Sequence, residues 1–177
     1  MNENISVLIS EEKIKNRITE IAMQLNEKFK GEKVTVICTL KGAFIFTADL
    51  VRQLDLDLRL EFLSAASYKG TESTGTLVMK HAVEWPIKGE NVILVEDILD
   101  TGRTLSHLSD YLKKQEPKSL ILVALLDKPD RRTIDIKCDI AGFTIPDKFV
   151  VGYGLDYDQK YRNLPYIGVI EQQQEVK

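Results

Sequence analysis

Several features are scarce in this chain of 177 residues. It has two cysteines, Cys38 and Cys138, two histidines, and no apolar run near the roughly 18–20 residues that span a bilayer. Met1–Ser10 lacks the basic and apolar regions of a secretory signal. Neither cysteine has a second Cys or a His at metal-ligand spacing. We therefore expect a soluble, cytoplasmic protein with reduced, inactive thiols.

Positive charge is not in excess either. The chain has 24 Lys and Arg against 27 Asp and Glu, which gives a net charge of −3, and no basic stretch is interleaved with aromatic residues. Proteins that bind nucleic acid normally show such a stretch. We expect a small-molecule partner, with no nucleic acid and no membrane, and one domain over residues 1–177 with an ordinary apolar content of 44%.

The spacing of apolar residues indicates alternating helices and strands. It predicts helices over 11–30, 43–54 and 104–114, and strands over 33–40, 58–63, 77–80, 91–95 and 119–126, with shorter strand-like pieces from 138 to 170. Such alternation predicts an α/β fold whose mostly parallel central sheet is flanked by helices. In such sheets the ligand site lies beyond the carboxyl ends of the strands.

The segment Val92–Leu105, VILVEDILDTGRTL, joins a predicted strand to a predicted helix. Free backbone N–H groups and the helix dipole favour an anion at such a junction. Gly102 permits a tight turn, the hydroxyls of Thr101 and Thr104 add donors, and Arg103 adds positive charge. The junction therefore predicts a phosphate site.

Three carboxylates, Glu96, Asp97 and Asp100, directly precede this phosphate site. They would repel a bare phosphate. A ribose diol together with a divalent cation reconciles the two, which favours a phosphorylated sugar as ligand. The alternative is that Glu96 and Asp97 are solvated residues ending a strand and that Asp100 is an N-cap.

The same segment resembles the phosphoribosyl pyrophosphate signature of the type I phosphoribosyltransferases. From about residue 34 to residue 170 the chain resembles the hypoxanthine-guanine phosphoribosyltransferases, and the resemblance includes Leu40-Lys41-Gly42, Ser67-Tyr68, Leu126-Asp127-Lys128 and IPDKFVVGYGLDY at 145–157. It implies the type I fold with a small hood of N- and C-terminal segments. It also implies purine salvage: phosphoribosyl transfer to hypoxanthine or guanine, Mg²⁺ dependence, and a homodimer or homotetramer.

The resemblance assigns roles around the phosphorylated sugar. Glu96 and Asp97 would hold the ribose hydroxyls and, with Asp156, the Mg²⁺ ion, while Asp100 would exchange a proton with purine N7. The loop Asp100–Thr104 would hold the 5′-phosphate, with Arg103 where many relatives carry Lys. The remaining implied contacts are Lys41, Gly42 and Arg162 with pyrophosphate, at a Leu40–Lys41 peptide that can be cis, and Lys128, Phe149 and Val150 with the base.

Ser67 and Tyr68 begin a polar stretch to Thr76 that resembles the family's mobile loop. Each assignment has a structural alternative. Lys41-Gly42 could be an ordinary turn and 67–76 a linker. Lys128 could be a solvated lysine, Phe149 and Val150 core residues of a strand, and Asp156 and Arg162 a surface ion pair.

Rival functions differ in the base or in the class of protein. A transferase for xanthine, adenine or uracil would share the 92–105 signature, and a non-catalytic RNA-binding regulator could sense phosphoribosyl pyrophosphate. A bare interaction domain would leave the polar signatures unexplained. GTESTGTL at 70–77 lacks the Lys-Ser/Thr of a P-loop, and His81 and His107 build neither a zinc site nor a triad.

Overall fold

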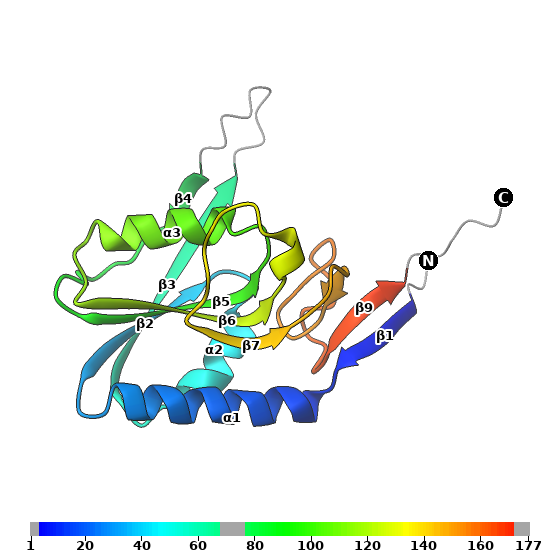
Figure 1. Ribbon diagram of the computed structural model, residues 1–177, viewed down its shortest axis with the longest axis horizontal. Helices are drawn as coiled ribbons and strands as arrows, with labels where there is room; N and C mark the ends of the chain where they lie inside the picture. The colour runs from blue at the N-terminus through cyan, green and yellow to red at the C-terminus, as the bar shows by residue number, and fades with distance from the viewer. Residues whose placement is uncertain (1–3, 68–76, 172–177) are drawn as a thin grey trace.

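The computed structural model describes residues 4–67 and 77–171 (Figure 1). The elements, in chain order, are β1 (Asn4–Ile9), α1 (Glu11–Lys28), β2 (Lys33–Thr39), α2 (Phe44–Val51), β3 (Asp57–Ser67), β4 (Leu77–His81), β5 (Asn91–Leu99), α3 (Arg103–Lys113), β6 (Ser119–Asp127), a short 3-10 turn η1 (Pro129–Arg131), β7 (Ile140–Thr144), β8 (Val150–Val151) and β9 (Ile167–Glu171). Every helix and strand that the apolar spacing predicts is present, with boundaries shifted by a few residues.

The main sheet has the strand order β4-β3-β2-β5-β6-β7. Its strands β3, β2, β5, β6 and β7 are parallel, and only the edge strand β4 runs antiparallel to its neighbour. The expected α/β fold with a mostly parallel sheet is therefore confirmed. The central strand β5 is longer than the predicted 91–95, because its pairing with β6 continues as far as Leu99 opposite Asp127.

A second, antiparallel sheet has the order β1-β9-β8 and joins the two ends of the chain. Asn4 pairs with Glu171, and Val150 pairs with Val169. We call this sheet with the segment 145–166 the hood; Figure 1 shows β1 and β9 beyond the arrowhead of β7. The apolar pattern did not predict β1, since it is an edge strand in which only Ile9 is buried.

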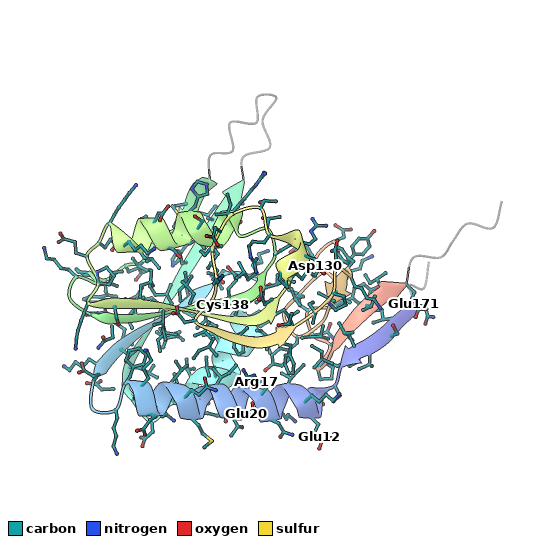
Figure 2. All side chains as sticks on the ribbon, in the orientation of Figure 1. Glu12, Arg17, Glu20, Asp130, Cys138 and Glu171 are labelled. Atoms are coloured by element: carbon teal, nitrogen blue, oxygen red, sulfur yellow. The ribbon has the colours of Figure 1, made fainter. Side chains whose placement is uncertain are left out.

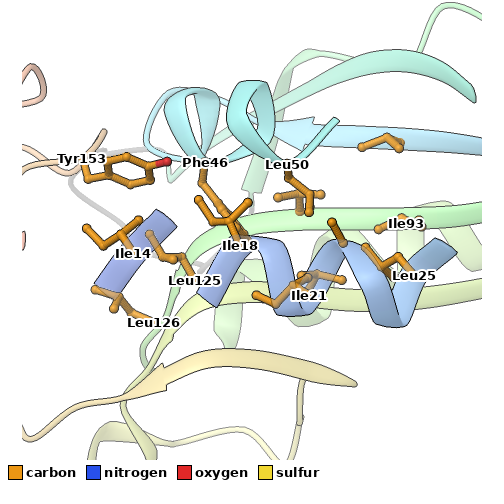
Figure 3. Packing of buried hydrophobic residues seen from close by; sticks show 14 of the residues in the cluster. Ile14, Ile18, Ile21, Leu25, Phe46, Leu50, Ile93, Leu125, Leu126 and Tyr153 are labelled. Carbon is orange, nitrogen blue, oxygen red and sulfur yellow. The ribbon is translucent and has the colours of Figure 1, made fainter. Parts of the chain in front are cut away.

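Helices cover both faces of the main sheet (Figure 1). Ser10 caps α1, its hydroxyl accepting a bond from the Lys13 backbone N–H at 3.4 Å. One face of α1 packs against α2 and the sheet in a continuous core formed by Ile14, Ile18, Ile21, Leu25, Phe46, Leu50, Ile93 and Leu125, among others (Figure 3). On the opposite face Leu105, Leu108 and Leu112 of α3 pack against the sheet. The sheet is thereby held between two apolar layers.

Polar contacts tie α1 to the sheet edge. The guanidinium of Arg17 donates to the backbone carbonyls of Ala141 and Gly142 in β7, at 2.8 and 2.9 Å (Figure 2). No helix within the described residues is long and apolar enough to cross a membrane.

The two thiols are free and lie away from solvent to different extents. Burial raises the pKa of the Cys38 thiol, in β2, to about 11. Cys138, which is partly buried before β7, also has a raised pKa, chiefly because of burial. Neither has the low pKa of a reactive cysteine.

Candidate active site

The carboxyl ends of β2, β5 and β6 meet at one edge of the sheet because these strands are parallel neighbours. A cleft of about 210 Å³ opens there. Its lining residues are Thr39, Leu40, Lys41, Gly42, Leu63, Ala65, Glu96, Asp97, Thr104, Leu108, Asp156 and Arg162. The cleft therefore combines residues predicted to bind ribose, pyrophosphate and metal.

Glu96 and Asp97 lie inside β5 rather than in a loop after it. A Glu96 carboxylate oxygen lies 2.8 Å from the Thr39 hydroxyl and accepts a bond from the Asp97 backbone N–H at 3.1 Å. Burial, followed by the negative charge of Asp97, raises the pKa of Glu96 well above its usual value. Glu96 and Asp97 are both partly buried near the end of β5, so they are not fully solvated, and a cation or hydroxyl donors would offset their mutual repulsion.

The loop Asp100–Thr104 borders a second, smaller hollow of about 70 Å³. Glu96 and Thr104 line both this hollow and the cleft. Gly102 has φ 84° and is the N-cap of α3 without any side-chain cap. Asp100 is consequently no helix cap, which removes the structural alternative for it. The Thr101 hydroxyl accepts a long bond of 3.4 Å from the Arg103 backbone N–H, and the Arg103 side chain is exposed at the start of α3.

The segment 131–136 packs against this loop and donates hydrogen bonds to its backbone carbonyls. The Thr101 carbonyl accepts bonds from the backbone N–H groups of Thr133 and Ile134, at 3.0 and 3.2 Å. Arg132 donates to the Leu99 carbonyl at 3.1 Å and also contacts Asp127 and the Asp100 carbonyl. A Cβ at position 102 would lie 2.6 Å from an Ile136 methyl, so the close approach requires glycine.

Arg131 is a site residue that the sequence did not reveal. Its Nε lies 3.1 Å from Asp100 Oδ1, and its Nη1 lies 3.7 Å from Asp147. Asp147 in turn lies 3.8 Å from the Lys128 ammonium. The acid predicted to move a proton and the lysine predicted to contact the base are thus linked by alternating charges. Two adjacent arginines after Lys128 were the available signal, but no periodicity or motif marked them.

Gly42 lies where three segments meet. A Cβ there would fall 1.5 Å from the Asp97 carboxylate, and a Cβ at Gly154, which has φ 101°, would fall 2.0 Å from the Gly42 carbonyl. The Leu40–Lys41 peptide is cis. Gly42 is therefore required for packing against Asp97, beyond the flexibility that an ordinary turn would need.

Asp156 and Arg162 form an ion pair at 2.7 Å on the hood side of the cleft. Their side chains are 26% and 20% exposed, so the pair is partly buried rather than on the open surface. Arg162 also donates to the Gly154 carbonyl at 2.7 Å. Gln159, which the sequence did not mark, contacts Arg162, Asp156 and the Lys41 ammonium.

The residues predicted to contact the base come from the end of β6, which Lys128 follows, and from the hood, which contains Phe149 and Val150. Lys128 is only 7% exposed, and its ammonium donates to the Lys148 carbonyl, so it is no solvated lysine. Phe149 is 54% exposed, with its ring edge-on to Tyr157 at 5.5 Å, and so it is no core residue. Val150 is buried in β8, which agrees with the structural alternative for that residue alone.

The predicted substrate contacts of Ser67 and Tyr68 cannot be compared with the geometry. Ser67 is the last residue of β3, and Tyr68 with the rest of the predicted loop to Thr76 lies outside the described residues. Within residues 4–67 and 77–171, no group of three or more His, Cys, Asp or Glu residues could by itself hold a metal ion. The oxygen donors of Glu96, Asp97 and Asp156 nevertheless line one cleft.

The fold and the cleft together define an α/β protein with a polar cleft at the carboxyl edge of a parallel sheet, which is where proteins of this class bind their ligands. The family of the phosphoribosyl transferase domain matches residues 8–158. The chain therefore belongs to the phosphoribosyltransferase family, as the 92–105 signature predicted.

Named relatives narrow this class. Hypoxanthine phosphoribosyltransferase of Salmonella typhimurium is 42% identical over 173 residues, covering 96% of this chain and 97% of the relative. The crystal structure of a hypoxanthine-guanine phosphoribosyltransferase from Bacillus anthracis is 44% identical with a TM-score of 0.90, covering 96% of this chain and 99% of that one. The hypoxanthine phosphoribosyl transferase of Trypanosoma cruzi is 37% identical with a TM-score of 0.90, covering 97% and 93%.

Gly42→Ala should lower transferase activity by at least about 100-fold, because the new methyl would displace the Asp97 carboxylate and nearby displacements of about 1 Å have such effects. Steady-state kinetics would measure this loss. The control is Gly89→Ala, which has open space and a positive φ of 74° far from the cleft. It should lower stability while leaving turnover unchanged, and near-normal turnover of Gly42→Ala would show that Asp97 tolerates displacement.

Proposed function

We propose that this protein transfers the 5-phosphoribosyl group from phosphoribosyl pyrophosphate to hypoxanthine or guanine, giving IMP or GMP and pyrophosphate, as a purine salvage enzyme. One observation carries the proposal. The small hollow is bordered by the anion loop Asp100–Thr104, and the cleft is bordered by the cationic residues Lys41 and Arg162. The two cavities are adjacent, because Glu96 and Thr104 line both. A substrate with a phosphate at one end and a pyrophosphate at the other fits such a pair. The names of the relatives supply the bases.

The sugar phosphate is bound by the end of β5 and the start of α3. Backbone N–H groups of the loop, with the hydroxyls of Thr101 and Thr104, hold the 5′-phosphate, and Arg103 adds charge. The carboxylates of Glu96 and Asp97 accept hydrogen bonds from the ribose 2′- and 3′-hydroxyls. Because the raised pKa of Glu96 reflects burial beside another carboxylate, ribose hydroxyls or a cation would relieve that repulsion.

Magnesium fits the donor set of the cleft. Mg²⁺ is usually held by one or two carboxylates plus substrate phosphates, rather than by an all-protein cage. Glu96, Asp97 and Asp156 offer carboxylate oxygens in the same cleft as Lys41 and Arg162. When bound there, the ion neutralises charge on the departing pyrophosphate.

The base is positioned by Lys128, which follows β6, and by Phe149 and Val150 of the hood. The Lys128 ammonium, with three N–H donors, bonds the purine 6-oxo group in addition to its present partner, the Lys148 carbonyl. The exposed ring of Phe149 stacks on the base, and backbone groups of Val150 contact its edge. Asp100 takes up or returns the proton at N7 while the ribose C1 faces the attacking nitrogen.

We further propose that the protein works in the cytoplasm as a homodimer or homotetramer. Phe44 of α2 and Leu60 and Phe62 of β3 are exposed large apolar residues. Leu60 and Phe62 pair with Val36 and Cys38 and so lie on the sheet face that α2 also covers. A second copy of the chain is the occupant that this apolar surface favours.

The direct test is incubation of the purified protein with phosphoribosyl pyrophosphate, Mg²⁺ and each base in turn. We expect IMP from hypoxanthine and GMP from guanine, and loss of turnover after thorough chelation because three acids line the cleft. Preference for xanthine, adenine or uracil would favour a sister transferase. Binding of phosphoribosyl pyrophosphate without turnover of any base would favour a regulator, and full activity after chelation would contradict the role of the metal.

Asp100→Asn should lower kcat by roughly 10²–10⁴-fold, the range typical of a general acid or base, because the amide cannot take up the proton. Phosphoribosyl pyrophosphate should still bind, since the loop backbone is unchanged, and calorimetry would measure that affinity. Asp110→Asn serves as the control, because Asp110 is an exposed acid in α3 that does not line the cleft. Near-normal kcat for Asp100→Asn would remove Asp100 from proton transfer.

Lys128→Gln should narrow the preference for hypoxanthine over adenine. An ammonium only donates, so it favours a 6-oxo acceptor over a 6-amino donor, whereas an amide both donates and accepts. Sites of this kind discriminate by roughly 10⁴–10⁵-fold. The measurement is the ratio of kcat/KM for the two competing bases. If the ratio does not change, Lys128 is not the residue that selects the base, and the backbone near Val150 becomes the better candidate.

A further inference from the structure

Gln159 occupies an unfavourable backbone position in the hood. Tyr157 and Lys160 exchange two backbone hydrogen bonds, of 3.2 and 3.0 Å, across the two-residue loop Asp158-Gln159. Both loop residues have positive φ, 48° and 64°, which is the pattern of a type I′ hairpin turn. Glycine is preferred at the second position of such a turn, because a side chain there is strained by the positive φ. Local turn chemistry therefore does not explain glutamine.

The side chain of Gln159 instead connects three residues of the cleft. Its Oε1 accepts hydrogen bonds from Arg162 Nη2 at 3.3 Å and from Lys41 Nζ at 3.4 Å. Its backbone N–H donates to Asp156 Oδ2 at 2.9 Å, and its Nε2 lies 3.4 Å from the same oxygen. Lys41, Asp156 and Arg162 all line the cleft, whereas Gln159 is exposed and does not line it.

Charge explains why an amide suits this place. Arg162 is already paired with the Asp156 carboxylate at 2.7 Å, and Lys41 comes from a distant part of the chain. A second carboxylate between the two cations would satisfy their charge and compete with an anionic ligand. An amide oxygen accepts from both cations without adding charge, and its NH₂ group reaches the carboxylate at the same time.

We propose that Gln159 is a positioning residue that holds Lys41, Asp156 and Arg162 in a geometry suited to pyrophosphate while leaving their charge available. This inference rests on the proposed function for its ligand. It extends the site to a residue that does not line the cleft. This role accounts for a glutamine at a position whose positive φ favours glycine.

The deciding variant is Gln159→Gly, with Asp158→Gly as matched control. Both relieve a positive φ in the same turn, so both should leave the melting temperature unchanged or raised. Only Gln159→Gly removes the amide. It should weaken binding of magnesium pyrophosphate, measured by calorimetry, by roughly tenfold, the effect of losing a hydrogen bond to a charged group. The KM for phosphoribosyl pyrophosphate should rise similarly, with the KM for the base unchanged.

Gln159→Glu keeps the side-chain length and the backbone cost but adds a charge between the cations. It should also weaken pyrophosphate binding, and more so at low ionic strength. Wild-type pyrophosphate affinity in both Gln159→Gly and Gln159→Glu would overturn the proposal. Equal loss in Asp158→Gly would also overturn it, because the turn rather than the amide would then be responsible.

The two proposals fail separately. If the wild-type protein binds magnesium pyrophosphate but forms no nucleotide from any base, the proposed function fails while the calorimetric comparison of Gln159 variants remains decisive. If Gln159→Gly does not fold, the role of the side chain is structural and the proposal is wrong. Turnover by the wild type together with unchanged pyrophosphate affinity in the variants would reject the role of Gln159 alone.

Discussion

The site depends on two adjacent carboxylates held inside a strand. Glu96 and Asp97 continue β5 past its apolar run, because β6 keeps pairing with β5 to Leu99. Both acids are partly buried next to each other, which is unfavourable without a cation or hydrogen-bond donors, and the raised pKa of Glu96 reflects this. The neighbouring residues accommodate both carboxylates. The Thr39 hydroxyl is within hydrogen-bond distance of Glu96, and Gly42 has no side chain that would collide with Asp97.

Cationic residues from outside the main sheet surround the site on two sides. The segment 131–136 holds the anion loop from one side, with Arg132 on the Leu99 and Asp100 carbonyls and Arg131 beside the Asp100 carboxylate. The hood supplies Arg162 from the other side, and Gly154 packs directly on the Gly42 carbonyl. Opposite charges therefore alternate across the site, so a substrate with two anionic ends meets donors at both.

Local patterns predicted the main sheet well and the hood poorly. Buried parallel strands such as β2 and β6 are continuous apolar runs, and α1 has a regular apolar face, so both are visible in sequence. Only one residue of β1 is buried, and β8 has two residues, so neither strand has a periodic signal. The end of β5 was missed because long-range pairing, rather than apolar character, continues that strand through Glu96 and Asp97.

The sequence by itself determined the class of protein, since the string 92–105 combines acids, glycine and hydroxyls at one strand-to-helix junction. The resemblance to the phosphoribosyltransferases also named most of the cleft residues, because its motifs can be matched to this chain position by position. Tertiary structure alone decided that Lys128 is buried, that Asp100 meets Arg131, and that Gln159 reaches Lys41. These contacts join segments far apart in the chain, and only the packing of the hood and the 131–136 segment onto the sheet edge brings them within hydrogen-bond distance.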